Sequence, residues 1–180
     1  TVIHDGITYT VHKIGDYQIV SERGITTYYG AFQFCKNLTS ITIPNSIVSI
    51  GDCAFYGCES LTSITIPNGV ESIGQHAFLR CNNLTTVTIP NSVKYILHYA
   101  FGECNNLTAV EIPAGVIRIC EGAFAKCSNL TTVIIPNSVE IIEESAFHEC
   151  ISLQNVTCLA TTPPELSGNM IFPFPNTAIL

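Results

Sequence analysis

Apolar and polar positions along this chain recur with a fixed period of about 23 residues, as they do in stacked repeats. Each unit contains an Ala-Phe pair, a cysteine at the third position after the Phe and a leucine at the third position after the cysteine. The pairs are Ala31-Phe32, Ala54-Phe55, Ala77-Phe78, Ala100-Phe101, Ala123-Phe124 and Ala146-Phe147, and the cysteines are Cys35, Cys58, Cys81, Cys104, Cys127 and Cys150. The regular spacing over most of the chain predicts one repeat architecture.

The interior of one unit predicts its local structure. The segment 61–66, Leu-Thr-Ser-Ile-Thr-Ile, alternates apolar and polar residues, which indicates a half-buried strand. Pro67 cannot donate to a sheet, so it ends the strand, and Asn68-Gly69 turns the chain. Val70 and Ile73 are then expected to point inward. The spacing over 74–81 predicts a short helix or 3₁₀ segment on the opposite side.

One such unit cannot bury its apolar side alone, whereas stacked units bury it against their neighbours. The strands would then form a parallel sheet along one wall, with ladders of Phe, Cys and Leu in the interior. The predicted fold class is α/β: a right-handed solenoid with a parallel β-sheet on one face and short helical or 3₁₀ turns on the other.

The pattern Cys-x-x-Leu-x-x-Ile-x-Ile-Pro-x-x-Val-x-x-Ile-x-x-x-Ala-Phe resembles the Treponema-type, BspA-like leucine-rich repeats of bacterial surface proteins. The resemblance covers residues 31–158 closely, and these residues are the predicted repeat domain. It implies a leucine-rich-repeat solenoid and a place at the cell surface or among secreted proteins. It also implies a role in adhesion or host interaction.

The two ends depart from the repeat. Residues 1–30 are predicted to form a hairpin cap, in which 7–11 pairs with 17–20 across 13–16. At the other end, Cys158 and Leu159 replace the strand Ile and the Pro. Residues 159–180 are therefore expected to be a C-terminal cap or the start of a truncated unit.

Charge excludes one class of function. The chain has 7 Lys plus Arg against 14 Asp plus Glu and a net charge of −7, whereas nucleic-acid binders need clustered positive charge. It also lacks an apolar run of about 18 residues, the length needed for a membrane-spanning helix.

The nine cysteines invite a metal or disulfide interpretation. Cys-x-x-Cys spacing is absent, and His76, His98 and His148 fall at different repeat offsets, so we predict neither metal nor cofactor. The six periodic cysteines are expected to be free, buried thiols, because Cys packs as a small apolar residue. The redox state of Cys53, Cys120 and Cys158, which lie off the ladder, stays open.

Catalytic motifs are also absent, and Glu143, Glu144 and Glu149 are interpreted as a solvated edge, so we predict no enzyme. The candidate binding surface lies on the outward strand positions, which form a neutral, hydroxyl-rich strip. A second candidate follows the Pro turn, where Lys94, Tyr95 and Arg118 would be neighbours beside the strip. The predicted binding residues are Ser40, Thr42, Ser63, Thr65, Thr86, Thr88, Glu111, Lys94, Tyr95 and Arg118.

These surfaces predict a monomeric, non-enzymatic module that recognises a protein or glycan partner. The family resemblance implies host extracellular matrix as one such partner. The alternative is a structural spacer that has no ligand of its own. Simple strand preference accounts for Thr on the strip equally well, and an ordinary solvated flank accounts for the second patch.

Overall fold

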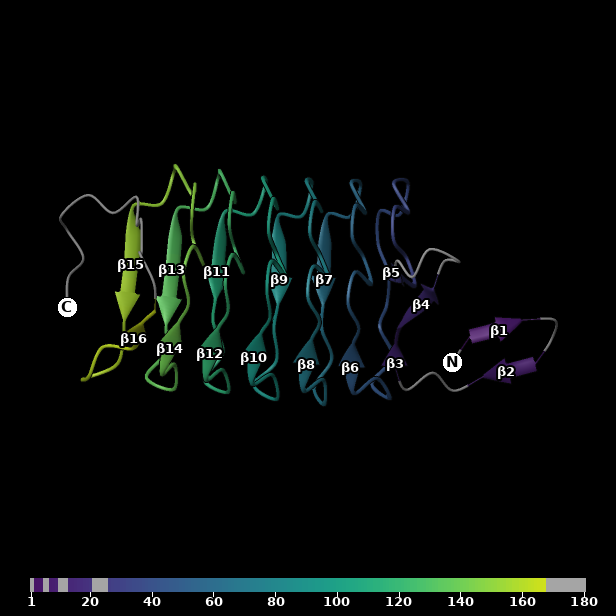
Figure 1. Cartoon of the computed structure of the whole chain (residues 1–180), viewed down its shortest axis with the longest axis horizontal. Helices are drawn as coiled ribbons and strands as arrows, with labels where there is room; N and C mark the ends of the chain where they lie inside the picture. Colours follow the sequence, from purple (N-terminus) through teal and green to yellow (C-terminus); the bar gives the residue numbers. More distant parts are fainter. Residues whose placement is uncertain (1, 5–6, 10–12, 21–25, 168–180) are drawn as a thin grey trace.

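The computed structural model describes residues 2–4, 7–9, 13–20 and 26–167, in which the chain winds into a row of stacked coils (Figure 1). In each complete coil, one strand runs along a first face, a Pro turn follows, and a shorter strand returns along a second face. The first face holds β7 (Ser63–Thr65), β9 (Thr86–Thr88), β11 (Ala109–Glu111), β13 (Thr132–Ile135) and β15 (Asn155–Cys158). A parallel β-solenoid is thereby confirmed.

The strands of the first face belong to two separate parallel sheets. One joins β7 to β9, and the other joins β11, β13 and β15 in that order. Within each sheet, register partners lie one full repeat apart, as for Ile64 and Val87. The first coil contributes no strand over residues 31–48, so the strand expected around Ser40 and Thr42 is not formed there.

The second face carries a seven-stranded sheet that the residue pattern did not predict. Its order is β16-β14-β12-β10-β8-β6-β3, and all of its pairings are parallel. The strands are β3 (Lys13–Ile14), β6 (Ser49–Ile50), β8 (Ser72–Ile73), β10 (Tyr95–Ile96), β12 (Arg118–Ile119), β14 (Ile141–Ile142) and β16 (Glu165–Leu166). Two-residue strands are too short to show an alternation of apolar and polar residues.

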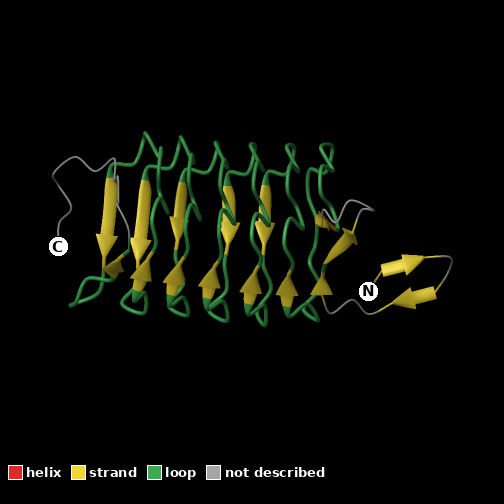
Figure 2. Cartoon of the chain, in the orientation of Figure 1, coloured by secondary structure: helices red, strands yellow, loops and turns green. Residues whose placement is uncertain are grey.

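The predicted helical or 3₁₀ segments are wrong: the described residues contain no helix, and these segments are successive turns (Figure 2). Most of the turn segments contain two residues with positive φ, such as Cys53 at 53° and Gly57 at 70°, which a right-handed helix excludes. Alternate amides also donate to the next coil. The Phe55 amide, for example, bonds to the Ala77 carbonyl at 2.7 Å. The backbone amides of these segments therefore make hydrogen bonds between coils as well as within them.

Aromatic rings form the centre of the core. Phe32, Phe55, Phe78, Phe101, Phe124 and Phe147 stack in one column, with neighbouring ring centroids between 5.1 and 5.4 Å apart and planes within 7° of parallel. Phe55, Phe78, Phe101 and Phe124 are completely buried. The predicted Phe ladder is thus confirmed.

The expected pairing at the N-terminal end is wrong. β2 (Ile7–Tyr9) pairs antiparallel with β1 (Val2–His4), and β4 (Asp16–Val20) pairs antiparallel with β5 (Thr26–Gly30). Alternation indicates a strand but does not select its partner, and chain-local hairpins close the shorter loops. Residues 1, 5–6, 10–12, 21–25 and 168–180 of the predicted caps lie outside the described residues.

We expect Phe101→Ala to lower the free energy of unfolding by about 3–5 kcal/mol, because it leaves a cavity between two stacked rings. Thr86→Ala, at an exposed strand position, is the control and should change stability by less than about 0.5 kcal/mol. Urea unfolding followed by circular dichroism measures both. A loss below about 1 kcal/mol for Phe101→Ala would contradict the central role of the column.

Candidate functional site

The outward positions of the first face form a continuous exposed row. Ser40, Thr42, Ser63, Thr65, Thr86, Thr88 and Glu111 are all exposed, and Ala109, Ile134, Asn155 and Thr157 extend the row. We call these residues together with Thr132 the strip. Between them, inward residues such as Ile64 and Val110 are only 3% and 4% exposed. The strip is therefore the outer layer of a well-packed wall, and Glu111 is its one charged member among the described residues.

Side chains of the strip have no polar partner within the described part of the chain. A neighbouring slot behaves differently: the hydroxyls of Thr85 and Thr131 donate to the Thr62 and Thr108 carbonyls of the preceding coils, both at 3.0 Å. The threonines of this slot thus link neighbouring coils through hydrogen bonds. The strip hydroxyls face solvent and have no such partner among the described residues.

The second candidate patch lies on the second face. Tyr95 and Arg118 are register partners of β10 and β12, as the sequence predicts. Tyr95 is 45% exposed, and Lys94 is exposed beside it. The Arg118 guanidinium, however, donates to the Glu143 carboxylate at 3.2 Å. Arg118 is therefore partly committed to the fold, and the patch is separated from the strip by the Pro turns.

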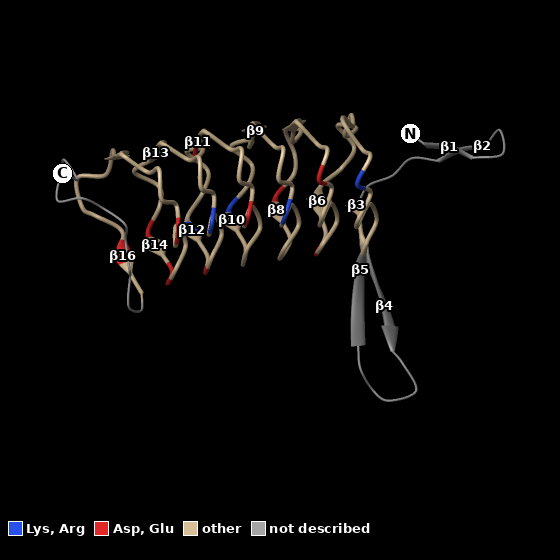
Figure 3. Cartoon of the chain, turned by 90° about the horizontal axis from the view of Figure 1, so that it is seen from above, with Lys and Arg blue, Asp and Glu red and all other residues tan. Residues whose placement is uncertain are grey.

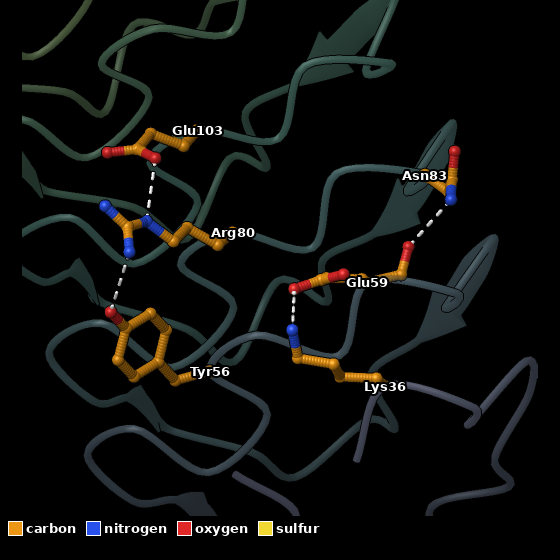
Figure 4. A network of polar contacts seen from close by, with 6 residues as sticks. All are labelled: Lys36, Tyr56, Glu59, Arg80, Asn83 and Glu103. Atoms are coloured by element: carbon orange, nitrogen blue, oxygen red, sulfur yellow. Dashed lines mark hydrogen bonds and ion pairs between the residues drawn. The ribbon is translucent and has the colours of Figure 1, made fainter. Parts of the chain in front are cut away.

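Charged side chains also link neighbouring coils along the turns (Figure 4). Lys36 contacts Glu59 at 2.8 Å, and the Arg80 Nε donates to Glu103 at 2.9 Å. Arg80 also reaches the Tyr56 hydroxyl at 3.4 Å. Exposed pairs of this kind contribute little to stability, because solvent screens the charges. Neither ion pair was predicted, although opposite charges one full repeat apart in the sequence would have revealed both.

Charged residues otherwise follow the turns and the second face, and the first face carries few of them (Figure 3). Any partner that docks on the strip therefore meets a neutral surface. Charge would contribute little to such an interface, while hydroxyl hydrogen bonds and backbone shape would contribute most of the specificity.

Cysteines form a second ladder beside the Phe column. Each buried periodic thiol donates to a Phe carbonyl of the preceding coil: Cys58 to Phe32 at 3.1 Å and Cys81 to Phe55 at 3.2 Å, with Cys104, Cys127 and Cys150 repeating the contact. The prediction of buried thiols holds for these five. It is wrong for Cys35, which is exposed because it lies at the end of the ladder.

Burial suppresses the reactivity of Cys58, Cys104 and Cys120. It raises the pKa of Cys58 and of Cys104 to about 12, and the pKa of Cys120 to about 11. The thiolate is the reactive and metal-binding form, and it is scarce at neutral pH in all three. None of the nine cysteines, which all lie in the described residues, forms a disulfide.

Two other features are absent from the described ranges, a metal site and a membrane-spanning helix. Those residues contain no group of three or more His, Cys, Asp or Glu side chains placed to hold a metal ion. In the same ranges, no helix has the length and apolar character needed to cross a membrane.

Comparison with protein families finds a match over residues 25–154, where six copies of the BspA type leucine rich repeat region are aligned. No curated protein matches the chain. A leucine rich repeat protein of T. pallidum superposes with a TM-score of 0.73 at 32% identity, covering 76% of this chain and 64% of that one.

A leucine rich cell surface protein of Faecalibacterium prausnitzii gives a TM-score of 0.66 at 31% identity, covering 79% of this chain and 38% of that one. The pneumococcal vaccine antigen PcpA, at 16% identity and a TM-score of 0.56, shares the fold alone. This chain thus spans less than two thirds of each of these proteins.

The burial of the thiols gives a direct prediction. In mildly alkaline buffer, iodoacetamide should label the exposed Cys35 while leaving Cys58 and Cys104 unmodified, because their raised pKa keeps them protonated below about pH 12 and reagent cannot reach them. Peptide mass spectrometry identifies the labelled sites. Denaturant is the control and should release both buried thiols for labelling. Rapid native labelling of Cys104 would contradict the ladder.

Proposed function

This chain belongs to the BspA-type leucine-rich repeat family, and from that premise we propose that it is a non-enzymatic binding module. The module recognises a protein or glycan partner through the strip of the first face. Repeat solenoids commonly bind partners along such extended surfaces, because stacked coils hold many side chains in one rigid array.

The observation that carries this proposal is the uncommitted row of hydroxyls. Buried or structural polar groups find partners within a fold, as Thr85 and Thr131 do. The strip presents the same residue type without such partners in the described chain. Each hydroxyl can both donate and accept a hydrogen bond, which suits a neutral polar partner.

We place the module at the cell surface or among secreted proteins. Support comes from the F. prausnitzii relative, which is described as a cell surface protein at 31% identity. The family match supports the same place, since the repeat region is of the BspA type. A host protein of the extracellular matrix or a surface glycan is then the natural partner to test.

A structural spacer is the competing function. In that case the coils would only hold other domains apart, and the strip hydroxyls would be bound to water alone. The exposed Tyr95 on the second face favours binding, because Tyr is enriched at interface centres.

Two lysines placed on the strip test the proposal. We expect Ser63→Lys with Thr65→Lys to weaken binding of a partner at least about tenfold, because the bulky charges must be desolvated at a neutral interface. Immobilised extracellular-matrix proteins and a glycan array serve as probes, with affinity measured by surface plasmon resonance. Gln75→Lys, at an exposed turn position, is the matched control. Equal binding by both variants would refute the strip, and an absence of any bound probe would favour the spacer.

The second face has a separate test. We expect Tyr95→Ala to weaken the same partner about tenfold while leaving the melting temperature unchanged, since the side chain is 45% exposed. Arg118→Ala serves as a comparison that also breaks the Glu143 contact. Unaltered affinity in Tyr95→Ala would confine the interface to the first face.

A further inference from the structure

A cleft of about 530 Å³ opens on the first face where its two sheets meet. It lies between β9 and β11, which are consecutive coils but not paired strands. Its lining comes from three coils and includes Asn68, Thr88, Asn91, Glu111 and Pro113. The volume falls within the range of about 300–1,000 Å³ that is typical of small-molecule sites.

The cleft exists because backbone hydrogen bonds between the coils of β9 and β11 are missing at this junction. On either side, the Thr85 amide donates to Thr62 and the Thr131 amide donates to Thr108, both at 2.9 Å. Among the described residues, the equivalent bond from Thr108 to Thr85 is not formed, in either its amide or its hydroxyl version. The Ile89 amide likewise lacks the bond to Glu111 that its counterpart Ile66 makes to Thr88 at 3.0 Å.

The Pro turns on the two sides of this junction also differ in sequence and contacts. Ser92 joins two turns, because its hydroxyl accepts from the Gly69 amide at 3.2 Å and donates to the Val70 carbonyl at 2.7 Å. In the next coil Gly115 takes the place of Ser92, so this link is lost. A Cβ at Gly115 would lie only 1.7 Å from the Asn91 carbonyl oxygen, which shows how closely the two turns approach at that corner.

The coils stay joined elsewhere, so the opening is confined to one face. On the second face, β10 and β12 remain paired through Tyr95 with Arg118 and Ile96 with Ile119. The cleft is thus a fixed feature between two rigid coils. Its floor includes Val87, which is half-buried, whereas its counterparts Ile64, Val110 and Val133 are fully buried.

We propose that this cleft binds a short neutral oligosaccharide, a proposal that rests on the binding role of the first face. Sugar hydroxyls both donate and accept hydrogen bonds, and the cleft offers complementary groups: a carboxylate at Glu111, amides at Asn68 and Asn91, and the Thr88 hydroxyl. Among the described residues the Ile89 amide has no acceptor, and Ile89 lines the cleft, so this amide adds a backbone donor. Val87 and Pro113 supply an apolar surface for the C–H face of a sugar ring.

Charge and shape select this ligand class over others. The lining contains no Lys or Arg, and Glu111 is its only charged residue, so acidic sugars and phosphates are repelled. An extended peptide that adds a strand needs a free sheet edge, whereas these two edges face each other and are closed behind by the second face. The described lining also contains no aromatic residue that could anchor an apolar ligand.

Two threonine variants form a matched pair, because Thr88 lines the cleft whereas the exposed Thr39 belongs neither to its lining nor to the strip. Saturation-transfer difference NMR and calorimetry on the full chain would use cellotriose, xylotriose, maltotriose, mannotriose and chitotriose as probes, with trigalacturonate as the acidic comparison. We expect at least one neutral trisaccharide to bind. Thr88→Ala and Glu111→Gln should each weaken it about tenfold, and Thr39→Ala should leave it unchanged.

Several results would overturn the proposed sugar site in the cleft. These are the absence of binding by every neutral probe, preferential binding of trigalacturonate, and binding that is insensitive to both Thr88→Ala and Glu111→Gln. A lysine-rich peptide that binds through Glu111 while every sugar fails would also overturn it. If every neutral sugar fails to bind while a protein partner is lost in the strip lysine variant, the sugar site is refuted and the proposed function stands.

Discussion

The structure depends on one constraint: the backbone of every coil must find its hydrogen-bond partners in the coils beside it. Short turn segments cannot satisfy themselves as a helix would, so alternate amides such as that of Phe55 donate to the next coil. This arrangement requires left-handed residues at fixed places, including Cys53 and Gly57, and a repeat length that does not vary. Ladders of Phe, Cys and Leu follow from that constant length, because equivalent side chains must then lie directly above one another.

Much of this could be predicted from the sequence, and the limits have physical causes. The period, the Phe column and the exposed strip follow from residue type and spacing alone, as does the neighbouring placement of Tyr95 and Arg118. The turns resemble helical segments in sequence because apolar spacing does not report φ, and left-handed residues such as His76, Arg80 and Glu103 carry no sequence mark. The second sheet escapes prediction because all of its strands are too short to alternate.

For the candidate surfaces as well, the sequence pattern predicts exposure but not the contacts of the side chains. Exposure of Thr65 and Thr88 was evident from alternation, but their lack of partners and the commitment of Arg118 to Glu143 needed coordinates. The opening between β9 and β11 was beyond sequence reasoning, since it arises from bonds that fail to form at one junction.

The buried thiol ladder has a consequence for how the protein matures. In an oxidising environment, every cysteine of the emerging chain is open to mispairing until its coil is covered. Each of the five buried ladder thiols is shielded by contacts with the adjacent coil, which is also its near neighbour in the sequence, and such local contacts form early in folding. Folding of each coil therefore competes with oxidation of its cysteine, and the short period of the repeat favours folding. Lengthening one turn would slow that step and expose its cysteine to wrong disulfides before the native column is complete.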